Sequence, residues 1–214
     1  MTAIAQIDMP DITFYFDLGS LFAYLAAERL SEVLPEAVVW QPVSLGALFK
    51  ANGRSSWAVG GPSRRQAGMV EVEQRALAYG LPPVRWPEQW PTNYLFAMRA
   101  ATFAFQQGRG REFTVQAFRH AFQQGKDLGV PEHVLQAAAA AGLDPRAVEE
   151  ATGEPEVKLA LRAATDAAHE LGVFGVPTVA VAVELFWGED CLQEAAAHGR
   201  SQTKRDQYSD RGES

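Results

Sequence analysis

The chain has 214 residues, of which 47% are hydrophobic, 21% charged and 10% aromatic. This composition is typical of a folded globular protein and excludes intrinsic disorder of the whole chain. Because 26 acidic side chains face 19 basic ones, the formal charge is -7, which disfavours the phosphate contacts of a nucleic-acid-binding protein. We therefore expect no nucleic-acid partner.

The single cysteine, Cys191, excludes an intrachain disulfide, a dithiol redox site and a cysteine-rich zinc site. The four histidines lack the paired spacing of metal ligands, so no metal site is expected. The N-terminus has no basic start followed by a long apolar run, which argues against a secretory signal. No stretch approaches the roughly 20 apolar residues of a membrane span. We expect a cytoplasmic protein with no membrane contact.

The first elements predict a β-α-β unit. Residues 12–16 are β-branched and aromatic, as in a short buried strand. Ser20 ends a short turn and can cap a helix over residues 21–34, where apolar side chains recur at helical spacing. Residues 38–43 form a second short apolar run with Pro42 near its end, as expected of a second strand.

The middle of the chain, residues 46–153, is rich in Ala, Leu, Gln and Glu between Gly and Pro residues, which predicts helices and no strand. Within it, residues 53–65 are predicted to be a mobile basic loop. A further helix over residues 155–171 leads to two strand-like runs that form a hairpin. The residues between these runs, Ala182 and Val183, lack the usual hairpin turn chemistry.

This order of elements resembles an α/β chain with a thioredoxin-like fold and an inserted all-helical domain. Residues 10–45 would supply the N-terminal β-α-β part, and residues 155–197 the C-terminal α-β-β-α part. Residues 46–154 would form the inserted helical domain. Residues 198–214 contain almost nothing apolar and are predicted to be a disordered, solvated tail.

Several motifs in the same order make the resemblance more specific. They are FYFDLGSLFAYLA at residues 14–26, LGALFKA at 45–51, PTNYLFAMR at 91–99, GVFGVPT at 172–178 and LFWGED at 185–190. Together they resemble the 2-hydroxychromene-2-carboxylate isomerase family, a relative of kappa-class glutathione transferases and, more distantly, of DsbA. The resemblance runs from about residue 12 to residue 194.

The resemblance implies a role for Ser20. In this family a serine stands where thioredoxins carry a redox cysteine, and the working thiol comes from bound glutathione. A free thiol, with a pKa near 8.5, is mostly neutral at pH 7, although the thiolate is the nucleophile. A helix N-terminus and a hydroxyl group can both stabilise that anion. The alternative is that Ser20 only caps its helix.

The resemblance also implies a set of residues that bind glutathione. Val176 and Pro177 would form a cis-proline loop that pairs with the peptide backbone, although a trans proline beginning an ordinary strand is the alternative. Glu189 and Asp190 would receive the γ-glutamyl end, with Asp190 pairing with its ammonium group. An acidic residue in the first turn of a helix is the alternative there.

Four positions depart from the family pattern. Leu21 and Ala23 stand where the family has a proline and a second serine, and Cys191 stands where it commonly has a basic residue. Arg54 replaces an asparagine that reaches the ligand, so Asn52 or Arg54 would have to substitute for it. Cys191 is most simply interpreted as a small buried apolar residue.

The function that the resemblance implies is a glutathione-dependent isomerase in aromatic catabolism, acting on a small aromatic molecule by reversible thiolate addition. One alternative is a kappa-like glutathione transferase, in which the thiol stays attached to the product. Another is a non-catalytic thioredoxin-fold binding domain, if the four departures have disabled the thiol site. A thiol-disulfide oxidoreductase is disfavoured because no cysteine stands at residues 20–23. The family also suggests a homodimer.

Overall fold

The computed structural model describes residues 12–34 and 38–209, with side chains as far as Ser201. The remaining residues, including 10, 11 and 210–214 of the predicted segments, lie outside the described part. Four strands form one sheet in the order β2-β1-β3-β4. β1 (Ile12–Phe16) pairs parallel with β2 (Val39–Pro42) and antiparallel with β3 (Thr178–Val181). β4 (Glu184–Trp187) pairs antiparallel with β3, as the predicted hairpin requires.

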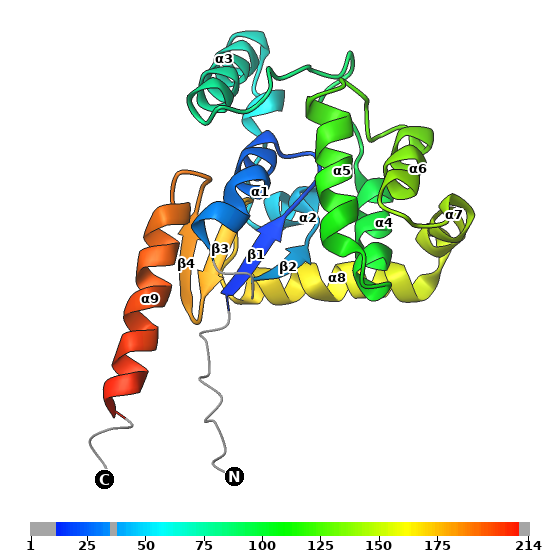
Figure 1. The fold of residues 1–214 in the computed structure, drawn as a ribbon. Helices are drawn as coiled ribbons and strands as arrows, with labels where there is room; N and C mark the ends of the chain where they lie inside the picture. The colour runs from blue at the N-terminus through cyan, green and yellow to red at the C-terminus, as the bar shows by residue number, and fades with distance from the viewer. Residues whose placement is uncertain (1–11, 35–37, 210–214) are drawn as a thin grey trace.

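Helices cover both faces of this sheet (Figure 1). The alternating side chains of β1 divide between two clusters because successive residues of a strand point to opposite faces. Phe14 and Phe16 belong to the cluster that includes α1 (Leu21–Val33) and α9 (Leu192–Ser209). Tyr15 packs against the other cluster, to which α8 (Pro155–Glu170) contributes. The end of β1 therefore lies between two helical layers.

The rest of the chain between β2 and α8 is helical in every described element, as predicted. Its helices are α2 (Leu45–Ala51), the 3-10 helix η1 (Trp57–Val59), α3 (Pro62–Ala78), α4 (Leu95–Gln106), α5 (Gly110–Phe122), α6 (Pro131–Ala140) and α7 (Pro145–Gly153). The helices α4 to α7 pack on one another beside the sheet, whereas α3 lies apart from them, next to α1 (Figure 1).

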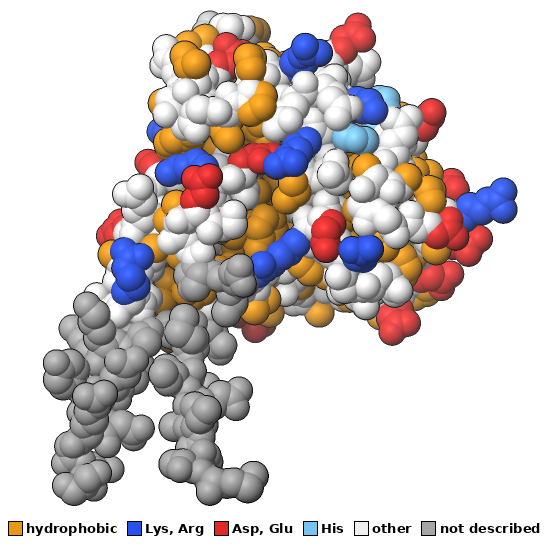
Figure 2. Space-filling view, viewed as in Figure 1, with side chains coloured by type: hydrophobic (Ala, Val, Ile, Leu, Met, Phe, Trp, Pro, Cys, Tyr) orange, Lys and Arg blue, Asp and Glu red, His pale blue; other side chains and the backbone are white. Residues whose placement is uncertain are grey.

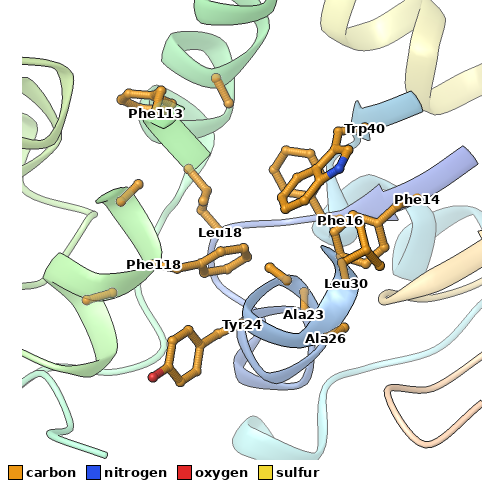
Figure 3. Packing of buried hydrophobic residues seen from close by; sticks show 14 of the residues in the cluster. Phe14, Phe16, Leu18, Ala23, Tyr24, Ala26, Leu30, Trp40, Phe113 and Phe118 are labelled. Atoms are coloured by element: carbon orange, nitrogen blue, oxygen red, sulfur yellow. The ribbon is translucent and has the colours of Figure 1, made fainter. Parts of the chain in front are cut away.

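The helical block shares its core with the sheet. The ring of Phe16 lies 6.0 Å from Trp40 on β2 and 6.2 Å from Phe118 on α5, measured between centroids. Phe118 in turn lies 6.1 Å from Tyr24 on α1 (Figure 3). Because these aromatic contacts join β1, β2, α1 and α5, the helical block is anchored to the sheet at the end where β1 leads into α1.

Two expectations about segments are corrected by the structure. The predicted loop over residues 53–65 contains η1 and the start of α3, where Pro62 occupies a first-turn position that suits proline. The predicted tail from His198 is helical as far as Ser209, because α9 continues through it. Ala195 and Ala196 anchor the start of α9 in the core, and the residues that follow contain no proline to end the helix.

The hairpin between β3 and β4 contains a residue in the left-handed region. Val181 pairs with Glu184, so Ala182 and Val183 form a two-residue turn, and Ala182 has a φ of 53°. This conformation costs an alanine about 1 kcal/mol relative to glycine. We predict that Ala182→Gly raises the free energy of unfolding by about 1 kcal/mol, measured by denaturant titration. Val183→Gly, at the neighbouring exposed position, should not; an equal gain from both variants would contradict this explanation.

Acidic and basic side chains are interspersed on the face shown in Figure 2, with apolar side chains between them. Within the described ranges, no helix is both long and apolar enough to span a bilayer. Nor do the described residues include three or more His, Cys, Asp or Glu side chains grouped as metal ligands.

Candidate active site

Ser20 lies at the junction between β1 and α1. Its backbone N–H donates to Asp17 O at 3.0 Å, which closes the turn after β1. Its Oγ accepts a hydrogen bond from Ala23 N at 3.2 Å, so Ser20 is the N-cap of α1. The same hydroxyl donates to Val176 O at 3.5 Å. The sequence prediction of a capping serine is therefore correct, and the structure adds a contact with the residue before Pro177.

Val176 and Pro177 form a cis peptide bond, as expected, and lead directly into β3. Both residues line a cavity of about 310 Å³ that we call the cis-proline cleft. Its other walls come from α1, α3 and the turn after β4, namely Phe22, Glu71, Arg75, Trp187 and residues 188–191. The fold thus brings together the start of α1, the cis-proline loop and the turn that contains Asp190.

Glu189 has a different environment from the one predicted for a ligand-binding residue. Its side chain is fully buried and forms ion pairs with Arg29, at 2.9 Å, and with Arg75. Arg29 also donates to Glu189 O at 3.3 Å and lies 3.6 Å from the centroid of the Tyr79 ring. Because two guanidinium groups already pair with this carboxylate, we assign Glu189 to holding the turn after β4 against α1 and α3.

Asp190 remains available to a ligand. Its side chain is 62% exposed, lines the cis-proline cleft and lies 3.6 Å from Arg75. Glu71, also at the cleft, pairs with the same Arg75 at 2.7 Å. The cleft therefore offers two exposed carboxylates beside Arg75, whose guanidinium group is already shared among Glu189, Glu71 and Asp190, and this suits a ligand that carries an ammonium group.

Asn52 and Arg54 occupy different surroundings. The side-chain amide of Asn52 donates to Leu48 O at 2.8 Å and lies 3.4 Å from Nδ1 of His169, so it ends α2 and faces α8. Arg54 stacks over Phe174, 4.7 Å from the ring centroid, and lies 5.9 Å from that of Trp187. Since Trp187 lines the cis-proline cleft, only Arg54 of the two lies next to that cavity.

Cys191 is half-buried at the start of α9 and lines the same cleft. Burial raises the pKa of its thiol, and the acidic neighbours Asp190, Glu194 and Glu189 raise it further. A thiol that stays protonated is a poor nucleophile. Its chemistry agrees with the predicted non-catalytic role, although it is less buried than expected.

A second cavity of about 320 Å³ lies on the other side of the β1-α1 turn, and we call it the aromatic pocket. Its walls include Asp17, Gly19, Leu45, Phe49, Trp90, Tyr94 and Met98. Ser20 itself lines neither cavity, but its neighbour Gly19 lines the aromatic pocket, and its contact Val176 lines the cis-proline cleft. The sequence analysis did not single out Asp17, Trp90 or Tyr94.

Asp17 fixes the geometry of the turn. Its Oδ1 accepts from Gly19 N and its Oδ2 from Leu45 N, both at 2.8 Å, so one carboxylate ties the turn before α1 to the start of α2. Burial raises the pKa of Asp17 to about 6, although both backbone N–H groups act in the opposite direction. The signal in the sequence was an aspartate two residues before a glycine, a spacing suited to such a side-chain turn.

Gly19 has to be a glycine because the ring of Tyr94 packs directly on it. A Cβ atom at residue 19 would overlap Cδ2 and Cε2 of Tyr94. We predict that Gly19→Ala displaces Tyr94, destabilises the protein by about 1–3 kcal/mol and lowers turnover. The check is the melting temperature and the activity of that variant. Gly153→Ala, where nothing lies within 4 Å of the added Cβ and which lines neither cavity, is the control; similar losses in both variants would contradict the steric explanation.

The site and the fold define a class: a thioredoxin-like protein with a serine at the start of α1 that contacts the residue before a cis-proline. The family model for the DSBA-like thioredoxin domain matches residues 11–198. The chain belongs to this family, and the α/β fold predicted from the sequence is confirmed.

The similar proteins include two curated relatives and one solved structure. A 2-hydroxychromene-2-carboxylate isomerase from Sphingobium xenophagum is 28% identical over 190 residues, which cover 85% of this chain and 93% of that protein. One from Pseudomonas putida is 26% identical over 192 residues, covering 85% and 90%. A solved 2-hydroxychromene-2-carboxylate isomerase superposes with a TM-score of 0.77 at 23% identity, covering 92% of this chain and 98% of the other.

Proposed function

We propose that the protein is a glutathione-dependent isomerase of the 2-hydroxychromene-2-carboxylate isomerase type. The similarity to two curated isomerases over 85% of the chain supports an enzyme of the isomerase class. The observation that carries the more specific proposal is the position of Ser20, which caps α1 and contacts Val176 of the cis-proline cleft, while its neighbour Gly19 lines the aromatic pocket.

The donor set of the cis-proline cleft fits glutathione. Its γ-glutamyl end carries an ammonium group, for which Asp190 and Glu71 offer carboxylates, and an α-carboxylate, which would compete with Glu71 and Asp190 for the guanidinium group of Arg75. The backbone of Val176, beside the cis-proline, suits pairing with the central cysteine of the peptide. Arg54, stacked near Trp187, could then receive the glycine carboxylate at the opposite end.

Ser20 would hold the sulfur of this ligand. Its hydroxyl proton now points to Val176 O over a long 3.5 Å contact, so little is lost when the hydroxyl turns toward a thiolate. The N-terminus of α1 adds a partial positive charge. Lowering a thiol pKa by one unit needs about 1.4 kcal/mol, which one charge-assisted hydrogen bond can supply. Bound glutathione would provide a thiolate that adds reversibly to a conjugated carbon and so permits rotation about a former double bond.

The aromatic pocket would hold the substrate. Trp90, Tyr94, Phe49 and Met98 provide apolar walls suited to a planar ring, and the volume of about 320 Å³ falls within the usual range for small-molecule sites. Burial and the charges of Asp127 and Asp17 raise the pKa of Tyr94 to about 12, so its phenol stays neutral. Tyr94 therefore adds no negative charge to the wall of the aromatic pocket.

The test is to mix purified protein with 2-hydroxychromene-2-carboxylate, with and without glutathione, and to follow the products by chromatography. We expect the trans open-chain isomer to form only when both protein and glutathione are present, with glutathione recovered unchanged. A stable glutathione conjugate would instead support a kappa-like transferase. Glutathione binding with no reaction of this substrate or of other conjugated carbonyl compounds would overturn the isomerase proposal.

A further inference from the structure

Asp17 is a buried titratable group that the proposed thiol chemistry does not use. The residue lines the aromatic pocket although it is only 5% exposed. Each carboxylate oxygen accepts one backbone N–H, from Gly19 and from Leu45, and a carboxylate oxygen can accept a second bond. The carboxylate is therefore held rigidly at the pocket wall, three residues before Ser20, with capacity left for a ligand.

The proposed substrate needs a proton transfer that a thiol at Ser20 does not provide. By its name, 2-hydroxychromene-2-carboxylate is a cyclic hemiketal, so its carbon-carbon double bond is held cis within a ring. Rotation about that bond requires the ring to open first. Opening removes the proton of the hemiketal hydroxyl, forms the ketone at C2, breaks the C2–O1 bond and leaves a phenolate oxygen that takes up a proton.

We propose that Asp17 is the general base that opens this ring, an inference that rests on the proposed function. The ionised carboxylate takes the hemiketal proton as the C2–O1 bond breaks and returns the same proton to the phenolate oxygen. The step is proton-neutral, consumes no other reactant and leaves Asp17 ionised for the next turnover. It also leaves the open cis isomer in the aromatic pocket, whose wall includes Gly19, the residue before Ser20.

The environment of Asp17 suits this role. Burial raises its pKa to about 6, so the carboxylate is ionised at neutral pH but remains a stronger base than an exposed aspartate. Backbone N–H groups face it from the β1-α1 turn and from α2. From the segment before α4 it faces Tyr94, which stays neutral, and Asp127 lies beyond Tyr94.

The experiment measures ring opening by itself, without glutathione. Exchange between closed 2-hydroxychromene-2-carboxylate and its open cis form is followed by NMR saturation transfer, with and without protein. We expect the wild-type protein to speed exchange by about 100-fold over buffer and Asp17→Asn to remove that gain. Asp144→Asn, which changes another carboxylate bonded to a backbone N–H, is the control and should behave as wild type.

Further readouts separate the outcomes. Because asparagine keeps only one of the two acceptor oxygens that hold the turn, some loss is expected with any substrate. In the presence of glutathione, Asp17→Asn should lose more activity toward 2-hydroxychromene-2-carboxylate than toward cis-benzylidenepyruvate, which has no ring to open. Should this variant fail to fold, the wild-type exchange rate tests the same point, because it should rise with pH through about 6. The proposal is wrong if wild-type protein does not speed exchange, or if Asp17→Asn slows both substrates equally. Exchange without any isomerisation would refute the proposed function and leave the role of Asp17 standing.

Discussion

Ser20→Ala should lower turnover by about 100-fold while leaving the fold intact, which is the typical cost of removing one donor to a reacting anion. The hydroxyl contributes a charge-assisted hydrogen bond to the thiolate, and alanine leaves only the N-terminus of α1 to stabilise that charge. The loss of the N-cap should also lower the free energy of unfolding by about 1 kcal/mol. Steady-state kinetics with saturating glutathione and denaturant titration measure the two effects separately.

A matched control is available at the start of α7. Asp144 caps that helix through a hydrogen bond from Arg146 N at 3.0 Å and lines neither the cis-proline cleft nor the aromatic pocket. Asp144→Ala should cost a similar stability with no loss of turnover. If Ser20→Ala retains full activity, or if both variants lose activity equally, Ser20 is only a helix cap.

Glu189→Ala should be among the most destabilising single substitutions in the protein, with a loss of about 3–5 kcal/mol. The fully buried carboxylate forms ion pairs with Arg29 and Arg75, and its removal leaves two guanidinium groups without their shared partner. Because this cluster joins α1, α3 and the turn that contains Asp190, the variant should also bind glutathione more weakly. Thermal unfolding and calorimetric titration measure the two effects.

The control for this prediction uses the same arginine. Glu71 pairs with Arg75 one helical turn away, but the Glu71 side chain is 51% exposed. Glu71→Gln should therefore cost less than about 1 kcal/mol, as exposed ion pairs generally do. Equal losses from the two variants would show that the burial of Glu189 does not determine its contribution.

The sequence predicted those elements whose local residue pattern favours the same secondary structure that the folded protein adopts there. An aromatic run marks strand β1, and a capping hydroxyl marks the helix that begins after Ser20. A Val-Pro pair marks the loop that proves to hold the cis-proline. The start of α3 was missed because Gly60, Gly61 and Pro62 are typical of a loop, although the proline occupies the first turn of the helix.

The parts of the site that depend on long-range pairing could not be predicted. Nothing near Glu189 in the sequence reveals that Arg29, 160 residues away, and Arg75, 114 residues away, pair with it. Tyr94 and Gly19 likewise meet only because the start of α4 packs on the turn after β1. The local pattern predicted Ser20 as a helix cap, and the family resemblance implied the cis-proline at Pro177, whereas the role of Glu189 and the aromatic pocket required the structure.

The central claim is that Ser20 and the start of α1 stabilise a glutathione thiolate, and its most direct test is a titration of glutathione into the protein at neutral pH. Thiolate absorbance in the ultraviolet is followed for the wild type and for Ser20→Ala. We predict a saturable thiolate signal for the wild type, and a much weaker one for the variant at equal occupancy. Absence of any saturable binding to the folded wild-type protein would contradict the claim and would favour a binding domain whose thiol site the changes at Leu21, Ala23, Arg54 and Cys191 have disabled.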